Sequence, residues 1–313
     1  MALKKATRDA YGEALVELGK TNPKIVVLDA DLSQSTKTVG FAREFPDRFI
    51  QVGIAEQDLI GTAAGLALAG KIPFASTFAV FAAGRAYDQI RNTVAYAGLN
   101  VKIAATHAGV TVGEDGGSHQ MLEDVALMRA IPGMTVIVPA DGIEAAAAVK
   151  AVAEYTGPVY LRMGRGAWPL IFDEAYEFRM GKATLIEDGD AATIIACGIM
   201  VSQALEAAKL LKSHGIQVRV LDMATVKPID TEAIVKAAQE TGAIVTAEEH
   251  NILGGLGGAV AEVLVETHPV PMERVGVKDV FGRSGRPDEL LKHYGLTPEA
   301  IVTAIQKVIA RKA

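Results

Sequence analysis

The stretch that decides the fold is Val52-Gly53-Ile54-Ala55-Glu56-Gln57-Asp58. Residues 49–54 are predicted to form a short strand, and the apolar, small-residue segment 59–69 is predicted to form a helix. Glu56 lies between them, after the end of the strand and just before the N-terminus of the helix. Burial favours the protonated form of a carboxyl group, which makes Glu56 a candidate proton donor or shuttle. The alternative is a helix-start Glu stabilised by backbone N–H groups and the helix dipole.

The composition predicts a soluble protein of about two domains. Half of the 313 residues are hydrophobic and the net charge is −6, with no block of like charge. This argues against nucleic acid or a membrane surface as the main partner. The only cysteine, Cys197, lies in a buried-strand pattern, which excludes a disulfide framework and favours a cytoplasmic location. Lys71 and Pro73 interrupt the most apolar stretch, so we expect no membrane span.

Strands alternate with helices through the first half of the chain. Strands are predicted at 25–28, 49–54, 73–77, 101–105, 134–138 and 159–162, and helices at 8–20 (with Thr7 as N-cap), 83–97, 121–130 and 142–154. This alternation predicts a parallel sheet, in which ligands bind beyond the carboxyl ends of the strands. Polar or aromatic residues follow five strand ends, namely Asp31 with Ser35, Glu56, Phe78 with Phe81, the loop from His107 to His119, and Arg165. We therefore expect one edge of the sheet to form a site.

A second α/β unit is predicted from about Ala191. Its strands are expected at 192–197, 217–222 and 243–247, and its helices at 201–213, 230–240 and 257–267. The domain boundaries are therefore predicted as 1–165 and 189–313, with 166–188 as a linker.

Several familiar motifs fail on inspection. The Gly65 to Lys71 stretch has Walker spacing, but Ile72 replaces the required Ser or Thr. The glycines at 254–258 lack the last glycine of a dinucleotide fingerprint, so tight packing at a helix start is the better interpretation. No Cys/His cluster has zinc spacing, and no nucleophile elbow occurs. Metalloenzyme and serine-hydrolase functions therefore have little support.

Several segments together resemble the transketolase family. They are GIAEQ at 53–57, STFAVF at 76–81, RAYDQIR at 85–91, THAGVTVGEDGGSHQ at 106–120, PADG at 139–142, VLDMATVKPID at 220–230, AEEHNILGGLG at 247–257 and SGRPDELLKHYGL at 284–296. The resemblance covers essentially the whole chain, but only the C-terminal half of a full transketolase. It implies a parallel-sheet α/β pyrimidine-binding domain of thiamine-diphosphate enzymes, followed by a smaller α/β transketolase C-terminal domain.

The resemblance also implies how the cofactor would be held. Glu56 matches the Glu that hydrogen-bonds the aminopyrimidine ring of thiamine diphosphate and favours its imino tautomer, which makes Glu56 catalytic as well as cofactor-binding. Phe78 and Phe81 match the aromatics that stack on the pyrimidine. One departure is Gly84, where the family often has an aromatic residue, so pyrimidine packing is expected to be looser or to be completed by Tyr87.

The same resemblance implies a site for a sugar phosphate. The positions that match phosphate contacts are Arg8, Ser35, His107 and Arg165. Asp115 matches the carboxylate that reads a substrate hydroxyl beside the carbonyl. His119 matches the residue that polarises the substrate carbonyl or moves its proton, and is therefore both catalytic and substrate-binding.

The Gly-Asp-Gly and Asn motif that binds diphosphate and metal in this family is missing from the sequence. We therefore expect a separate N-terminal transketolase subunit to bind the diphosphate and Mg²⁺ (or Ca²⁺), in a heterotetramer of two chains of each kind, with this chain inactive alone. The implied reaction moves a two-carbon ketol unit from a ketose phosphate to an aldose phosphate. Three alternatives stay open, namely a deoxyxylulose-phosphate synthase fragment, a 2-oxoacid dehydrogenase β subunit and a non-catalytic binding homodimer.

Overall fold

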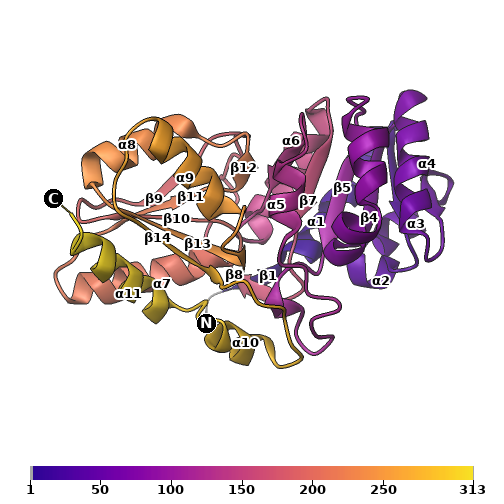
Figure 1. Ribbon diagram of the computed structural model, residues 1–313. Coiled ribbons are helices and arrows are strands. Elements are labelled where there is room, and N and C mark those ends of the chain that lie inside the picture. The colour runs from indigo at the N-terminus through magenta and orange to yellow at the C-terminus, as the bar shows by residue number, and fades with distance from the viewer. Residues whose placement is uncertain (1–2, 313) are drawn as a thin grey trace.

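The computed structural model describes residues 3–312, and it contains two α/β units that pack side by side (Figure 1). The first unit is built on a seven-stranded sheet with the order β12-β6-β7-β5-β4-β2-β3. Its six parallel strands are β2 (Ile25–Asp29), β3 (Phe49–Gln51), β4 (Ile72–Phe78), β5 (Lys102–Thr106), β6 (Thr135–Ile137) and β7 (Val159–Arg162). The predicted parallel α/β architecture is thus confirmed.

Helices cover both faces of this sheet. Alternate strand residues point to opposite faces, so Val27 packs with α1 (Thr7–Thr21), α3 (Val39–Glu44) and α6 (Gly142–Glu154). Its neighbour Leu28 packs on the other face, with α4 (Glu56–Leu68), α5 (Asp124–Arg129) and the segment 80–95. Because both faces are covered, most residues of these strands are apolar, as in parallel strands generally.

Four local predictions are wrong in detail. The strand predicted at 49–54 ends at Gln51, and the expected polar loop at 33–37 contains the short helix α2 (Ser33–Thr36). Thr7 is the first residue of α1 and not its N-cap, and its hydroxyl accepts a hydrogen bond from the Gly164 N–H at 3.0 Å. The helix expected at 83–97 is instead two π-helical turns, η2 (Val80–Arg85) and η3 (Gln89–Ala95).

The second unit has a five-stranded sheet with the order β14-β13-β10-β11-β9. Its strands are β9 (Thr184–Glu187), β10 (Thr193–Ala196), β11 (Arg219–Asp222), β13 (Ile244–Asn251) and β14 (Met272–Val277), and its helices are α7 (Met200–Ser213), α8 (Thr231–Thr241), α9 (Leu256–Glu266), α10 (Pro287–His293) and α11 (Pro298–Ile309). Cys197 is buried in the core, as predicted. Glu248 accepts the N–H groups of Leu256 and Gly257, so this carboxylate occupies the start of α9, where the glycine cluster lies.

One strand from the second half of the chain joins the sheet of the first unit. β12 (Thr225–Lys227), from the second half of the chain, pairs antiparallel with β6 of the first sheet. The segment 166–188 contains β8 (Ala167–Pro169), which pairs with β1 (Lys4–Ala6), and also β9. The boundaries at 165 and 189 therefore stay a prediction. Among residues 3–312, no helix is long and apolar enough to cross a bilayer.

Candidate active site

The carboxyl edge of the first sheet gathers most of the predicted site residues. Phe78 is the last residue of β4, His107 directly follows β5, and Glu56 is the first residue of α4. Arg8 belongs to the first turn of α1, and Ser35 to α2. Parallel strands end at one edge, and this places residues that lie far apart in the sequence side by side.

Glu56 is 3% exposed and forms an ion pair with Arg85, with Nη1 3.0 Å from Oε1. The Arg85 guanidinium also lies over the Phe81 ring, 4.2 Å from its centroid. Glu56 therefore has a charged partner that the sequence pattern does not indicate. Arg85 has no place among the predicted site residues, although it opens the RAYDQIR segment that carries the resemblance.

The two predicted aromatic residues form a continuous surface. The rings of Phe78 and Phe81 are stacked, with centroids 5.7 Å apart and planes 9° apart. Phe78 also stacks on the His107 ring with centroids 3.8 Å apart, and the rings of Phe81 and His119 make a T-shaped contact with centroids 5.5 Å apart. The structure thus brings both predicted histidines to the predicted aromatic pair.

Gly84, the departure noted in the sequence, has open space where a side chain would lie. Tyr87 does not take this place. Its hydroxyl reaches the Leu127 carbonyl at 3.4 Å, on α5. The group that covers Phe81 is the Arg85 guanidinium.

Arg8 and His107 form a polar pair beside the aromatic surface. Arg8 Nη1 donates to the Ser35 carbonyl at 2.9 Å and to His107 Nε2 at 3.1 Å. A guanidinium can only donate, so Nε2 accepts and Nδ1 carries the hydrogen that it donates to Thr106 Oγ1 at 2.9 Å. Burial, reinforced by Arg8 and Arg165, lowers the pKa of His107 to about 3. His107 is therefore a neutral donor beside a permanent cation.

Arg165 joins the loop that carries Asp115. Its Nη1 donates to the Val112 carbonyl at 2.6 Å and lies 3.6 Å from Asp115 Oδ2. Its positive charge also contributes to the lowered pKa of the Arg8 guanidinium, which is mainly due to burial. The cations Arg8 and Arg165 thus influence each other electrostatically, which suits an anionic ligand.

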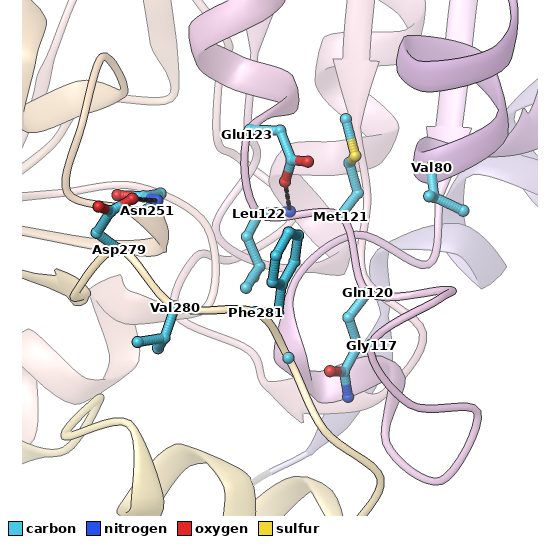
Figure 2. A pocket seen from close by; sticks show the side chains of 11 residues that line it. Val80, Gly117, Gln120, Met121, Leu122, Glu123, Asn251, Asp279, Val280 and Phe281 are labelled. Carbon is cyan, nitrogen blue, oxygen red and sulfur yellow. Dashed lines mark hydrogen bonds between the residues drawn. The ribbon is translucent and has the colours of Figure 1, made fainter.

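A cavity of about 310 Å³ opens between the two units, and none of the predicted site residues lines it (Figure 2). Its first-unit wall comes from Val80, Gly117 and residues 120–123, and its second-unit wall from Asn251 and residues 279–282. Phe281, on this wall, is 89% exposed. Within residues 3–312 no group of three or more His, Cys, Asp or Glu side chains is arranged to hold a metal ion.

Comparison with known proteins identifies the family. Residues 4–169 match the family described as "Transketolase, pyrimidine binding domain", and residues 181–301 match "Transketolase, C-terminal domain". The chain belongs to the transketolase family. This family implies thiamine diphosphate as the cofactor.

Three similar proteins show which part of a transketolase this chain represents. A solved structure described as "Split gene transketolase, inactive beta4 tetramer" is 57% identical, with a TM-score of 0.91 over 98% of this chain and 99% of that chain. The "6-deoxy-6-sulfo-D-fructose transketolase subunit SqwH" of Clostridium sp. (strain MSTE9) is 47% identical over 97% of this chain and 95% of its own length. The transketolase of Homo sapiens is 40% identical over 98% of this chain but only 49% of its own length. The chain is therefore the C-terminal section of a split transketolase-family enzyme.

Proposed function

We propose that this chain supplies the pyrimidine-binding half of a transketolase that moves a two-carbon ketol unit from a ketose phosphate to an aldose phosphate. The observation that carries the proposal is the unbroken series of contacts from Glu56 through Arg85, Phe81, Phe78 and His107. A carboxylate with its arginine partner, flat aromatic faces and a neutral imidazole paired with the Arg8 cation lie along one edge in that order. A bound aminopyrimidine and a sugar phosphate need these groups.

The residues fit thiamine diphosphate by their chemistry. When bound, the cofactor supplies the electron sink that lets a carbon–carbon bond beside a carbonyl be broken and remade. Glu56 holds a hydrogen bond with a nitrogen of the pyrimidine ring, and its position at the start of α4 stabilises the carboxylate. Phe78 and Phe81 orient the ring by stacking.

The remaining residues orient the sugar phosphate. Arg8, the Ser35 region, His107 and Arg165 bind the phosphate, and the charges of the two arginines select an anion. Asp115 accepts a hydrogen bond from a substrate hydroxyl. His119 makes a T-shaped contact with Phe81 and is only partly buried, so it holds or moves the proton of the substrate carbonyl.

A second chain completes this proposed site. It binds the diphosphate and the Mg²⁺ (or Ca²⁺) ion, for which residues 3–312 offer no cluster of ligands. The sulfofructose relative is named as a transketolase subunit, and the solved split-gene relative is described as an inactive β4 tetramer. Both descriptions support a two-chain enzyme, for which we propose two copies of each chain.

The test is a native co-purification in the cells that produce the chain. The tagged chain is isolated gently and assayed with thiamine diphosphate, Mg²⁺, xylulose 5-phosphate and ribose 5-phosphate. We expect a stoichiometric partner and formation of sedoheptulose 7-phosphate. Glu56→Gln should reduce this activity at least about 100-fold if Glu56 acts in the chemical step. Asp58→Asn, in the same helical turn but exposed, should leave it unchanged.

Other outcomes redirect or reject the proposal. A partner with deoxyxylulose phosphate or acylated lipoyl protein as the product would assign another thiamine reaction. Activity with a sulfosugar donor alone, like the named activity of the Clostridium relative, would keep the reaction and change the substrate. Full activity of the pure chain without a partner, or full activity of Glu56→Gln, would contradict the proposed roles.

A further inference from the structure

The loop that follows β5 carries three of the proposed substrate residues, and from within it is held by successive backbone turns and by the Gln120 side chain. This segment, residues 107–120, is called the histidine loop below. One 3-10 turn, Val110–Val112, is its single named element. His107, at its start, has a left-handed backbone with φ +56°, which a non-glycine residue keeps only when its surroundings enforce it. Contacts from outside the loop add to these internal bonds.

The second unit supplies several of the contacts that hold the histidine loop. Gln120 Nε2 donates to the Arg283 carbonyl at 3.0 Å, and Ser284 Oγ donates to the Glu114 carbonyl. Gly117 lies against the Gly282 carbonyl, so closely that a Cβ would be 2.6 Å from the oxygen. In Figure 2, Gln120 and Gly117 lie beside the segment that carries Val280 and Phe281.

The deepest of these contacts is made by Glu249, at the end of β13. Glu249 is 4% exposed, and its Oε1 accepts the Thr111 N–H at 2.7 Å. Thr111 lies in the 3-10 turn, four residues from His107 and four from Asp115. Gly109 packs directly on this carboxyl group, and a Cβ there would lie 2.2 Å from its carbon.

The Glu249 backbone is itself tied to the first unit. Arg162 Nη2 donates to the Glu249 carbonyl at 2.9 Å, and Arg162 Nε is paired with Asp124 at 2.8 Å. These contacts fix the position of Glu249 relative to β7, the strand that leads to Arg165. The backbone of Glu249 is therefore held in place by Arg162, and its carboxyl group contacts the histidine loop from this position.

We propose that Glu249 is a positioning residue that holds the histidine loop in the shape that presents His107 and Asp115 to the substrate. The inference rests on the proposed function for its substrate, but the structural claim concerns this chain alone. It gives the second unit a role in the site, which is to supply the carboxyl acceptor for the central turn of the loop. Glu249 acts through the loop and does not touch the reacting atoms.

The neighbouring Glu248 provides a matched control. Both residues are buried glutamates on β13 that accept backbone N–H groups, but Glu248 accepts from Leu256 and Gly257 of its own unit. Replacing either by Leu removes a buried acceptor and keeps most of the volume. Only the change at position 249 should therefore loosen the histidine loop.

The first experiment measures amide hydrogen exchange of the full chain, without partner or cofactor. We expect Glu249→Leu to speed exchange in peptides covering residues 107–120 about tenfold, equal to about 1.4 kcal/mol. Glu249→Gln, which keeps an acceptor oxygen, should stay close to the original rate. Glu248→Leu should speed exchange at the start of α9 instead. If Glu249→Leu does not fold, Glu249→Asp, with a shorter side chain, is compared with Glu248→Asp.

The second experiment measures kinetics in the complex with the partner chain. Glu249→Leu should raise KM for the sugar phosphate about tenfold while kcat changes less than about threefold, because His107 and Asp115 bind the phosphate and a hydroxyl of the substrate and neither is assigned the proton of the carbonyl. Unchanged loop exchange, or equal loosening of the loop by Glu248→Leu, would overturn the proposal. A loosened loop in a complex that transfers no ketol unit would refute the proposed function and leave the positioning role standing.

Discussion

Replacing Arg162 by Met should destabilise this chain by about 4 kcal/mol, because it leaves a buried charge without its partner. Arg162 is 5% exposed and Asp124 fully buried, with Nε 2.8 Å from Oδ2. Removing one member of such a pair typically results in a loss of about 3–5 kcal/mol. The carbonyls of Met121 and Glu249 also lose a hydrogen-bond donor, which lowers the stability by about 1 kcal/mol each. The apolar side chain that Arg162→Met introduces is buried and offsets part of this loss.

The stability is measured by urea unfolding. The transition is monitored by far-UV circular dichroism and by the fluorescence of Trp168, the only tryptophan. The matched control is Arg179→Met, since Arg179 and Glu177 form a pair whose side chains are 75% and 79% exposed. We expect the control to lose less than about 1 kcal/mol.

A double variant separates the charge effect from simple loss of packing. Asp124→Asn in the Arg162→Met background removes the unpaired charge, so part of the lost stability should return. The reasoning is refuted if Arg162→Met loses no more than the exposed control. It is also refuted if the stability lost by the double variant equals the sum of the losses of Arg162→Met and of Asp124→Asn alone, because residues of one buried pair should be strongly coupled.

Three further predictions concern single groups. Burial raises the pKa of Glu249 to about 7, above its value in an unfolded chain, so the stability contributed by its protonated form is complete below about pH 4 and is lost as the pH rises through 7. The lowered pKa of His107 acts in the opposite direction over this range, so the parent is compared with Glu249→Gln by urea unfolding at pH 5 and pH 8.5. The stability at pH 5 relative to pH 8.5 should be lower in Glu249→Gln than in the parent by about 2.6 kcal/mol. Gly109→Ala should destabilise by about 2–4 kcal/mol, because φ is +82° and the new methyl group meets Glu249, and a thermal midpoint within about 1 °C of the parent would contradict this. The imidazole of His107, with its pKa lowered to about 3 by burial and nearby cations, should show no titration by NMR between pH 8 and pH 5, whereas a midpoint near 6.5 would show that it is solvated.

Much of the fold was predictable because its signals are local. The alternation of apolar strands with amphipathic helices predicts the parallel sheet, and α6 has the predicted bounds, Gly142–Glu154. The site edge was predictable for the same reason, since Phe78 and His107 each stand at the end of a recognisable strand. The errors lie where backbone geometry departs from these patterns, as in the π-helical turns at 80–95, which have no simple periodic signal.

The sequence by itself determined the class of fold, the family resemblance and most of the candidate residues. Only the tertiary structure revealed the Arg85 pair with Glu56, the crossing of β12 to the first sheet and the contact of Glu249 with the histidine loop. Glu249 and Thr111 are 138 residues apart in the chain. Periodicity reports which face of an element is buried, but it carries no information about which distant segment covers that face. That choice depends on how the two units pack against each other.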